Sequence, residues 1–255
     1  MRLVFIHGIN EDHKKPLALR RKWQRALHSA WDAAGLSRPH YKLEMPYYGD
    51  LLADLAEPHT HRPAHDGHVH MPLLISKTGQ RMLLDVGKLL CVNKKKLANE
   101  IVRSKVAGSE WVQVVLSALD SDIPGFSPLL LRFVRQVDAY LKSPKTRTAV
   151  DNLVRPCLLD SPTVVVAHSL GSVIAYRLLR KVEKKAEVPL LVTLGSPLGI
   201  CTIKEHLSPP SLAFPAAVNA WLNATDEKDC VAFHSRLDHD TFIDGIENVV
   251  SVKHS

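Results

Sequence analysis

The sequence has few cysteines and no long apolar run. None of its four cysteines belongs to a Cys-x-x-Cys pair, so the pattern predicts reduced thiols rather than a disulfide framework. No apolar stretch approaches the roughly 20 residues that a membrane-spanning helix needs. Met1 and Arg2 lead directly into a predicted strand, so we expect no export signal and a cytoplasmic location. The cysteines are Cys91, Cys157, Cys201 and Cys230.

Charge of one sign is not concentrated in any long segment. The 33 Lys and Arg residues outnumber the 26 Asp and Glu residues and give a formal net charge of +7, but they are spread along the chain. This distribution predicts at most a weak attraction to anionic surfaces and no nucleic-acid partner. The densest basic run, residues 94–96, is typical of a solvated helix face. Peripheral contact with an anionic membrane is the alternative.

Strand and helix patterns alternate along the chain. With 255 residues and 45% hydrophobic content, the chain can bury a large core in one domain, residues 1–255. The alternation predicts an α/β fold with a mostly parallel central sheet flanked by helices. The expected strands are 2–6, 41–46, 163–167, 188–194, 218–224 and 249–252. The expected helices are 18–34, 129–141, 148–158 and one that follows Ser169.

The alternation stops between residues 55 and 130. This segment begins with a His- and Pro-rich stretch and continues with helical patterns at 80–90 and 97–119. An insertion of this size inside a compact α/β unit is typical of a lid, so we expect a helical cap. Its apolar runs would pack the cap on the core or line a substrate pocket.

Residues 163–172 join an apolar, β-branched run to a helical pattern through one tight turn. Ser169 occupies the apex, and small residues lie two positions away on each side, Ala167 and Gly171. This is the pattern of a nucleophile elbow, a strained strand–turn–helix unit that exposes a serine hydroxyl at the edge of a sheet. An ordinary turn with a helix-capping serine is the alternative reading.

Polar residues follow several predicted strands at the point where each strand ends. His7 and Gly8 follow the first strand, Ser169 follows the apolar run, Asp229 comes soon after the 218–224 strand, and His254 follows the last strand. The carboxyl ends of parallel strands share one edge of a sheet, where reactive groups gather. We therefore expect these residues to lie along one edge.

The sequence resembles the α/β-hydrolase fold, in particular the lipase- and esterase-like serine hydrolases, over nearly the whole chain outside residues 55–130. The resemblance rests on His7-Gly8, the elbow, residues 194–198, the 221–231 stretch and a late histidine. The order Ser, Asp, His along the chain agrees with that family. Ala167 stands where the usual elbow has glycine, and the family's closing helix has no counterpart before Ser255. The last departure leaves open whether the strand holds His254 or a piece of the native protein is absent.

The resemblance implies a catalytic triad. Ser169 would be the nucleophile, His254 the base and Asp229 the acid that orients the imidazole. His168, beside the serine, would point away to pack or to cap. Open alternatives are His234 and His239 for the base and Asp226 for the acid.

The resemblance also implies an oxyanion hole and substrate contacts. The backbone N–H groups of Leu170 and Ile9 would stabilise the tetrahedral intermediate. No cofactor or metal is expected. The expected substrate contacts are His7, Gly8, Tyr48 and Ser196.

Residues 59–70 contain five histidines. The tract has neither a cysteine nor a helical pattern to fix ligand geometry, so we expect a solvated loop, with a zinc site as the alternative.

The expected activity is hydrolysis of a carboxylic ester through an acyl-serine intermediate. A thioesterase, amidase, peptidase or acyltransferase would use the same triad. A non-catalytic binding module and a peripheral phospholipase are further alternatives.

Overall fold

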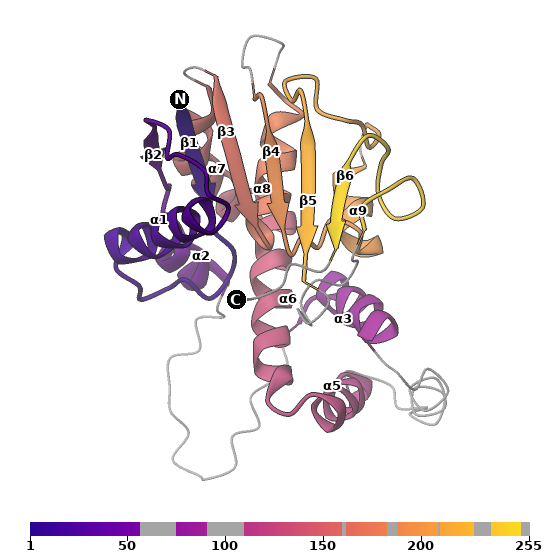
Figure 1. Ribbon diagram of the computed structural model, residues 1–255. Helices are drawn as coiled ribbons and strands as arrows, with labels where there is room; N and C mark the ends of the chain where they lie inside the picture. Colours follow the sequence, from indigo (N-terminus) through magenta and orange to yellow (C-terminus); the bar gives the residue numbers. More distant parts are fainter. Residues whose placement is uncertain are drawn as a thin grey trace.

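The computed structural model describes residues 1–56, 75–90, 110–159, 162–182, 188–208, 210–226 and 236–250. Over these residues, six parallel strands form one sheet in the order β2-β1-β3-β4-β5-β6 (Figure 1). The predicted α/β class and parallel sheet are therefore confirmed. The strands are β1 (Arg2–Ile6), β2 (Lys42–Glu44), β3 (Thr163–His168), β4 (Leu191–Leu194), β5 (Trp221–Thr225) and β6 (Glu247–Val250).

Eight helices fall within the described ranges, and they flank the sheet and extend beyond its carboxyl edge. Helix α1 starts two residues earlier than predicted because Pro16 suits the first helical position, where its missing N–H is not needed. Two short helices, α2 and α9, were not predicted. The helices are α1 (Pro16–Ala33), α2 (Gly49–Ala56), α3 (Lys77–Leu90), α5 (Glu110–Asp122), α6 (Phe126–Lys142), α7 (Pro144–Leu159), α8 (Leu170–Leu179) and α9 (Cys201–Leu207).

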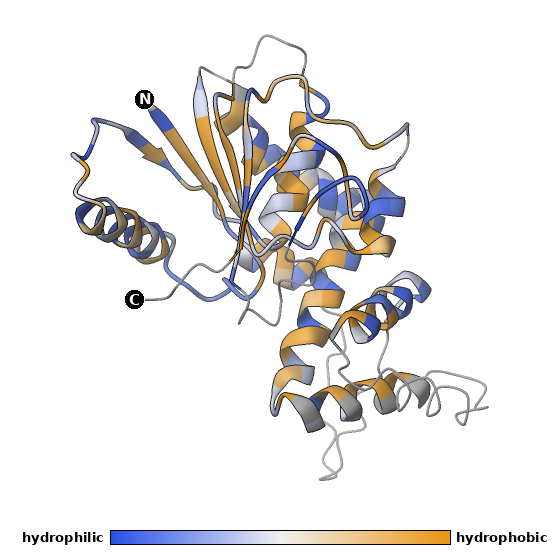
Figure 2. Ribbon diagram, turned by 45° about the vertical axis from the view of Figure 1, so that its right-hand side comes forward, coloured by the Kyte–Doolittle hydropathy of each residue, from blue (hydrophilic) through white to orange (hydrophobic). Residues whose placement is uncertain are grey.

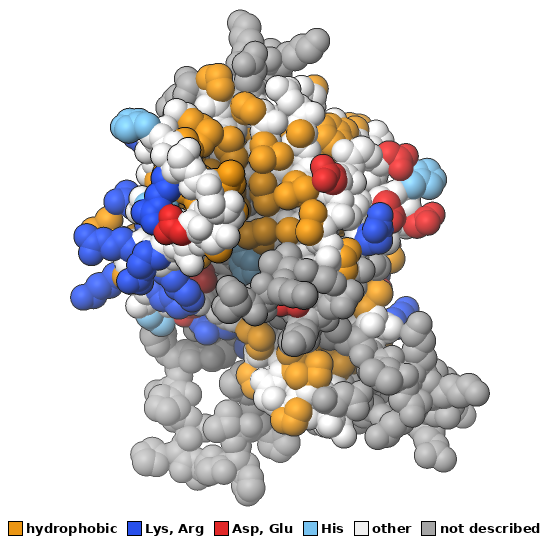
Figure 3. All heavy atoms as spheres, in the orientation of Figure 1, with side chains coloured by type: hydrophobic (Ala, Val, Ile, Leu, Met, Phe, Trp, Pro, Cys, Tyr) orange, Lys and Arg blue, Asp and Glu red, His pale blue; other side chains and the backbone are white. Residues whose placement is uncertain are grey.

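The sheet separates two layers of unequal thickness. Helix α1 lies alone on one face among the described helices, and α7 and α8 cover the other (Figure 2). The burial of β3 alternates accordingly: Val165 and Ala167 are fully buried under the helices, whereas Val166 on the α1 face is half-buried. Figure 3 shows the resulting apolar surface beside α1. Parallel sheets are normally covered on both faces, so this half-open face is an unusual feature of the described part of the chain.

Helices α3, α5 and α6 lie at and beyond the carboxyl edge of the sheet (Figure 1). Val112, Val115 and Leu119 of α5 are buried in the main core cluster, so these apolar side chains pack on the core. Helix α3 is joined to α9 by Asp85, whose carboxylate accepts hydrogen bonds from the backbone N–H and hydroxyl of Thr202 at 2.9 and 2.5 Å. That these helices form a lid over a substrate stays a prediction.

Several sequence predictions fall on residues that the structure does not describe. These include the histidine tract 59–70, the lysine run 94–96, Cys91 and Cys230. Cys157 and Cys201 are free thiols.

Within the described ranges, no helix is long and apolar enough to cross a membrane, and no group of three or more His, Cys, Asp or Glu side chains is arranged to hold a metal ion.

Candidate active site

Ser169 lies in a strained turn between β3 and α8. Its backbone has φ 50° and ψ −124°, a conformation that normally requires glycine. The backbone N–H of Ser169 donates to the Leu194 carbonyl at 2.9 Å, which ties the turn to β4. The Ser169 hydroxyl is buried, and it has no hydrogen-bond partner among the described residues. A strained, unpartnered serine at the carboxyl edge of a parallel sheet has the arrangement of a nucleophile elbow.

The small residues around the elbow are required by close backbone contacts. A Cβ atom on Gly171 would lie 2.3 Å from the Ile6 carbonyl oxygen and 2.6 Å from that of His7. A Cβ atom on Gly8 would lie 2.9 Å from the Ser169 Cβ atom. The loop after β1 therefore passes directly against the serine.

Replacing Gly171 by alanine should destabilise the protein. The added methyl group would meet the carbonyl oxygens of Ile6 and His7, which are backbone atoms and cannot rotate away. We expect the free energy of unfolding to fall by about 3 kcal/mol, the upper part of the range for overpacked sites. Urea denaturation measures this difference, and Ser29→Ala on the exposed side of α1 is the control. An unchanged unfolding midpoint for Gly171→Ala would contradict the close approach of α8 to β1.

Two further serines hold the elbow in place. The Ser172 hydroxyl donates to the Ser169 carbonyl at 2.6 Å and lies 2.7 Å from the Ser196 hydroxyl. Because the single proton of Ser172 is used on the carbonyl, Ser196 must donate to Ser172. Ser196 also accepts a hydrogen bond from the Leu198 N–H at 3.4 Å. Ser196, expected from the sequence to contact substrate, is thus a buried brace between β4 and the elbow. Ser172 was missed, although its place in the first turn of the helix was visible.

His7 and Tyr48 form a second brace. His7 is fully buried, its Nδ1–H donates to the Gly8 carbonyl at 2.9 Å, and its Nε2 accepts from the Tyr48 N–H at 3.2 Å. The two rings stack with centroids 3.9 Å apart, and the Tyr48 hydroxyl donates to the His7 carbonyl. Burial lowers the pKa of His7 to about 4 and raises that of Tyr48 well above its ordinary value. Both side chains were expected to contact substrate, and the structure gives them buried partners that fix the loop carrying Gly8.

The expected oxyanion donors flank this brace and the nucleophile. Leu170 is the first residue of α8, so its N–H is one of those that an α-helix leaves without an intrahelical partner. Ile9 follows Gly8, and its side chain packs against the main core cluster. The partial positive charge at the start of α8 favours a developing oxyanion there. The donor roles of the two N–H groups stay predictions.

The other triad residues are only partly described. Asp229, His254 and the alternative base His234 lie outside the described residues. Asp226, the alternative acid, directly follows β5 and is half-buried. His239, the other alternative base, is 83% exposed and lies 3.3 Å from the equally exposed Asp244 carboxylate. That surface pair makes His239 a weaker candidate than a histidine at the sheet edge.

Sequence reasoning missed two buried polar atoms near the carboxyl edge. The Thr225 hydroxyl, in the last residue of β5, and the Asn10 side-chain oxygen, in the loop after β1, have no hydrogen-bond partner among the described residues. Buried polar atoms are almost always paired. Together with the Ser169 hydroxyl, they place three polar atoms without a partner among the described residues at or just after the carboxyl ends of β1, β3 and β5.

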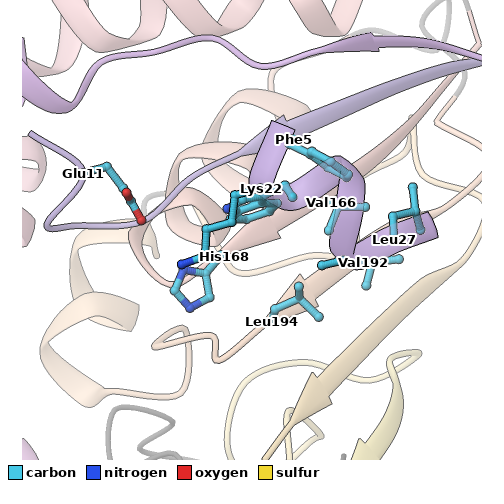
Figure 4. Close-up of a pocket in the computed structure, with 10 residues that line it drawn as sticks. Phe5, Glu11, Lys22, Leu27, Val166, His168, Val192 and Leu194 are labelled. Carbon is cyan, nitrogen blue, oxygen red and sulfur yellow. The ribbon is translucent and has the colours of Figure 1, made fainter. Parts of the chain in front are cut away.

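An apolar cavity of about 550 Å³ lies beside the elbow on the α1 face (Figure 4). His168, the neighbour of Ser169, stands at one end of it and packs edge-on against Trp23 at 6.0 Å between ring centroids. Glu11 and Lys22 are the charged residues at its boundary. The apolar lining consists of Phe5, Trp23, Ala26, Leu27, Val166, Val192 and Leu194.

No protein-family model matches the sequence, and no curated protein matches it either. The fold that the described residues define is an α/β fold with a parallel central sheet and flanking helices.

Proposed function

We propose that the protein is a serine hydrolase of the α/β-hydrolase type. The observation that carries this proposal is the backbone of Ser169, which adopts a conformation suited to glycine while its hydroxyl is buried without a partner among the described residues. Both features cost free energy, and such costs are typical of functional sites. A turn with only a structural role would be more stable with glycine at this position.

Within that class, we propose that the protein cleaves carboxylic esters. Ser169 attacks the acyl carbon while His254 takes the hydroxyl proton, and Asp229 stabilises the imidazolium that forms. The N–H groups of Leu170 and Ile9 stabilise the oxyanion. His254 then gives its proton to the leaving alcohol. In the second half of the reaction, His254 takes a proton from a water molecule that attacks the acyl carbon, and it returns this proton to the Ser169 oxygen as the carboxylic acid leaves. The apolar cavity beside His168 favours a substrate with an apolar group.

A fluorophosphonate probe tests the activated serine without knowledge of the substrate. We expect the wild-type protein to be labelled on Ser169, as located by peptide mass spectrometry, and Ser169→Ala to lose the label. His254→Ala should lose nearly all labelling because the hydroxyl then has no base. Ser29→Ala, an exposed serine on α1, is the matched control and should be labelled normally.

Further variants decide between the alternatives within the triad. Asp229→Asn and Asp226→Asn distinguish the two candidate acids, and His234→Ala and His239→Ala test the alternative bases. A folded wild-type protein that is not labelled, or that is labelled on another serine, would overturn the proposal and favour a binding module. If labelling succeeds, p-nitrophenyl esters of increasing acyl length measure how the cavity selects substrate.

A further inference from the structure

A second pocket, of about 340 Å³, lies between the start of α7 and the ends of α8 and α9. Ser169 precedes α8, whereas the pocket residues Arg177, Arg180 and Lys181 lie at or just beyond its other end. At 1.5 Å per residue, about 12 Å or more of helix separates them from the nucleophile. The pocket is therefore distinct from the carboxyl edge of the sheet. Its lining residues are Arg147, Arg177, Arg180, Lys181, His206, Leu207 and Pro210.

The pocket carries a large excess of positive charge. Four of its lining side chains are arginine or lysine, and none of the lining residues that the structure describes is acidic. Within the described part of the chain, Arg177 pairs with Asp151, a buried carboxylate that also accepts a hydrogen bond from the Tyr140 hydroxyl at 2.8 Å. Burial, followed by the charge of Arg177, lowers the pKa of Lys181 below its ordinary value. The excess charge thus acts on side chains inside the pocket.

The guanidinium groups are held in place mainly by neutral acceptors. Arg147 donates to the Leu141 carbonyl at 2.8 Å, and Arg180 donates to the carbonyls of Leu207, at 2.5 Å, and Ser211. Carbonyl oxygens orient these groups without cancelling their charge. Because these side chains are already ordered, they lose less conformational entropy when a ligand binds.

His206 adds a fifth polar group to the lining. Its Nδ1–H donates to the Thr202 carbonyl at 2.9 Å, which directs the other ring nitrogen, Nε2, away from α9's own backbone. Planar guanidinium groups match the oxygens of a phosphate in paired hydrogen bonds, and an ammonium group adds a point charge. A phosphate group carries close to two negative charges at neutral pH. A phosphate therefore suits this pocket better than a single carboxylate.

We propose that this pocket binds a phosphate group, either of a small phosphorylated molecule or of a phospholipid headgroup. The pocket volume is at the small end of the range for ligand sites, about 300–1,000 Å³, and it exceeds what inorganic phosphate alone fills. This proposal does not depend on the hydrolase activity, because the pocket shares no residue with the proposed triad.

Calorimetric titration of the full chain with pyrophosphate tests the proposal. The informative variant is Arg147→Gln combined with Lys181→Gln. Arg177 pairs with the buried Asp151, and Arg180 holds carbonyls 27 and 31 residues away, so their replacement could disturb the fold, whereas Arg147 contacts the Leu141 carbonyl only six residues away. We expect pyrophosphate binding to weaken about tenfold or more in the double variant, because two charge-assisted contacts are lost. Lys88→Gln, an exposed lysine on α3, is the matched control and should bind as the wild type does.

A second arm distinguishes the two sources of phosphate. The same proteins are sedimented with phosphatidylcholine vesicles that contain phosphatidic acid, and with vesicles of phosphatidylcholine alone. Pyrophosphate binding that depends on Arg147 and Lys181 supports a soluble ligand, and vesicle binding with the same dependence supports a headgroup. Absence of both, or equal binding by the wild type and a folded double variant, would overturn the proposal.

Discussion

Ser169→Gly is expected to be more stable than the wild-type protein and to have no hydrolase activity. The serine has φ 50° and ψ −124°, a conformation that costs a non-glycine residue about 1–3 kcal/mol and costs glycine little. Its buried hydroxyl lacks a partner among the described residues, which adds a desolvation cost. Against these gains, glycine loses about 0.5–1 kcal/mol more backbone entropy on folding. We therefore expect the free energy of unfolding to rise by about 1–2 kcal/mol.

Ser169→Ala separates the two contributions. Alanine removes the hydroxyl and keeps the Cβ atom, so it should recover the desolvation cost and leave the backbone strain. Urea denaturation of the three proteins should then rank them glycine, alanine, serine in decreasing stability, with neither variant labelled by the fluorophosphonate. If Ser169→Gly proved less stable than the wild type, the turn would be relaxed and the main support for a nucleophile elbow would be lost.

The protein should lose stability steeply between pH 6.5 and pH 4 because of His7. Burial lowers the pKa of His7 from 6.5 to about 4 in the folded state. Above pH 6.5 the imidazole is neutral in both states and contributes no pH dependence. As the pH falls, the unfolded state binds a proton that the folded state does not, so unfolding becomes more favourable. The loss is about 2 kcal/mol at pH 5 and approaches about 3 kcal/mol near pH 4.

His7→Gln isolates this effect. The variant should be less stable than the wild type at pH 7, because it loses the stacking on Tyr48. Its stability should fall less between pH 7 and pH 5, by about 2 kcal/mol. His40→Gln, an exposed histidine, is the control and should retain the wild-type pH dependence. Parallel pH profiles for His7→Gln and the wild type would show that the imidazole takes up protons in the folded state.

Strong local patterns accounted for most of the fold. The apolar β-branched run before Ser169 predicted β3, and the helical spacing after it predicted α8. Short helices were missed because seven or eight residues make too few local contacts to specify a helix. Helix α9 begins where Asp85, 117 residues earlier in the sequence, accepts the Thr202 N–H. No reading of the local sequence could have supplied that partner.

Roles at the site were harder to predict than positions. His7, Tyr48 and Ser196 were predicted to contact substrate, but residue type alone does not tell whether a polar side chain faces substrate or a neighbouring loop. The stacking of His7 on Tyr48 joins residues 41 positions apart. The second pocket likewise brings together residues as far apart in the sequence as Arg147 and His206. Because the basic residues are evenly spread along the chain, the sequence alone could not show that positive charge gathers there.

By itself, the sequence determined the α/β class, the parallel sheet and the position of the strained serine, because hydrophobic periodicity and small-residue spacing are local properties. Only the tertiary structure decided which polar side chains are braces, which are left without partners among the described residues, and where positive charge accumulates. Those properties depend on burial and on contacts between distant segments, and burial sets both the pKa of His7 and the cost of an unpaired hydroxyl at Ser169.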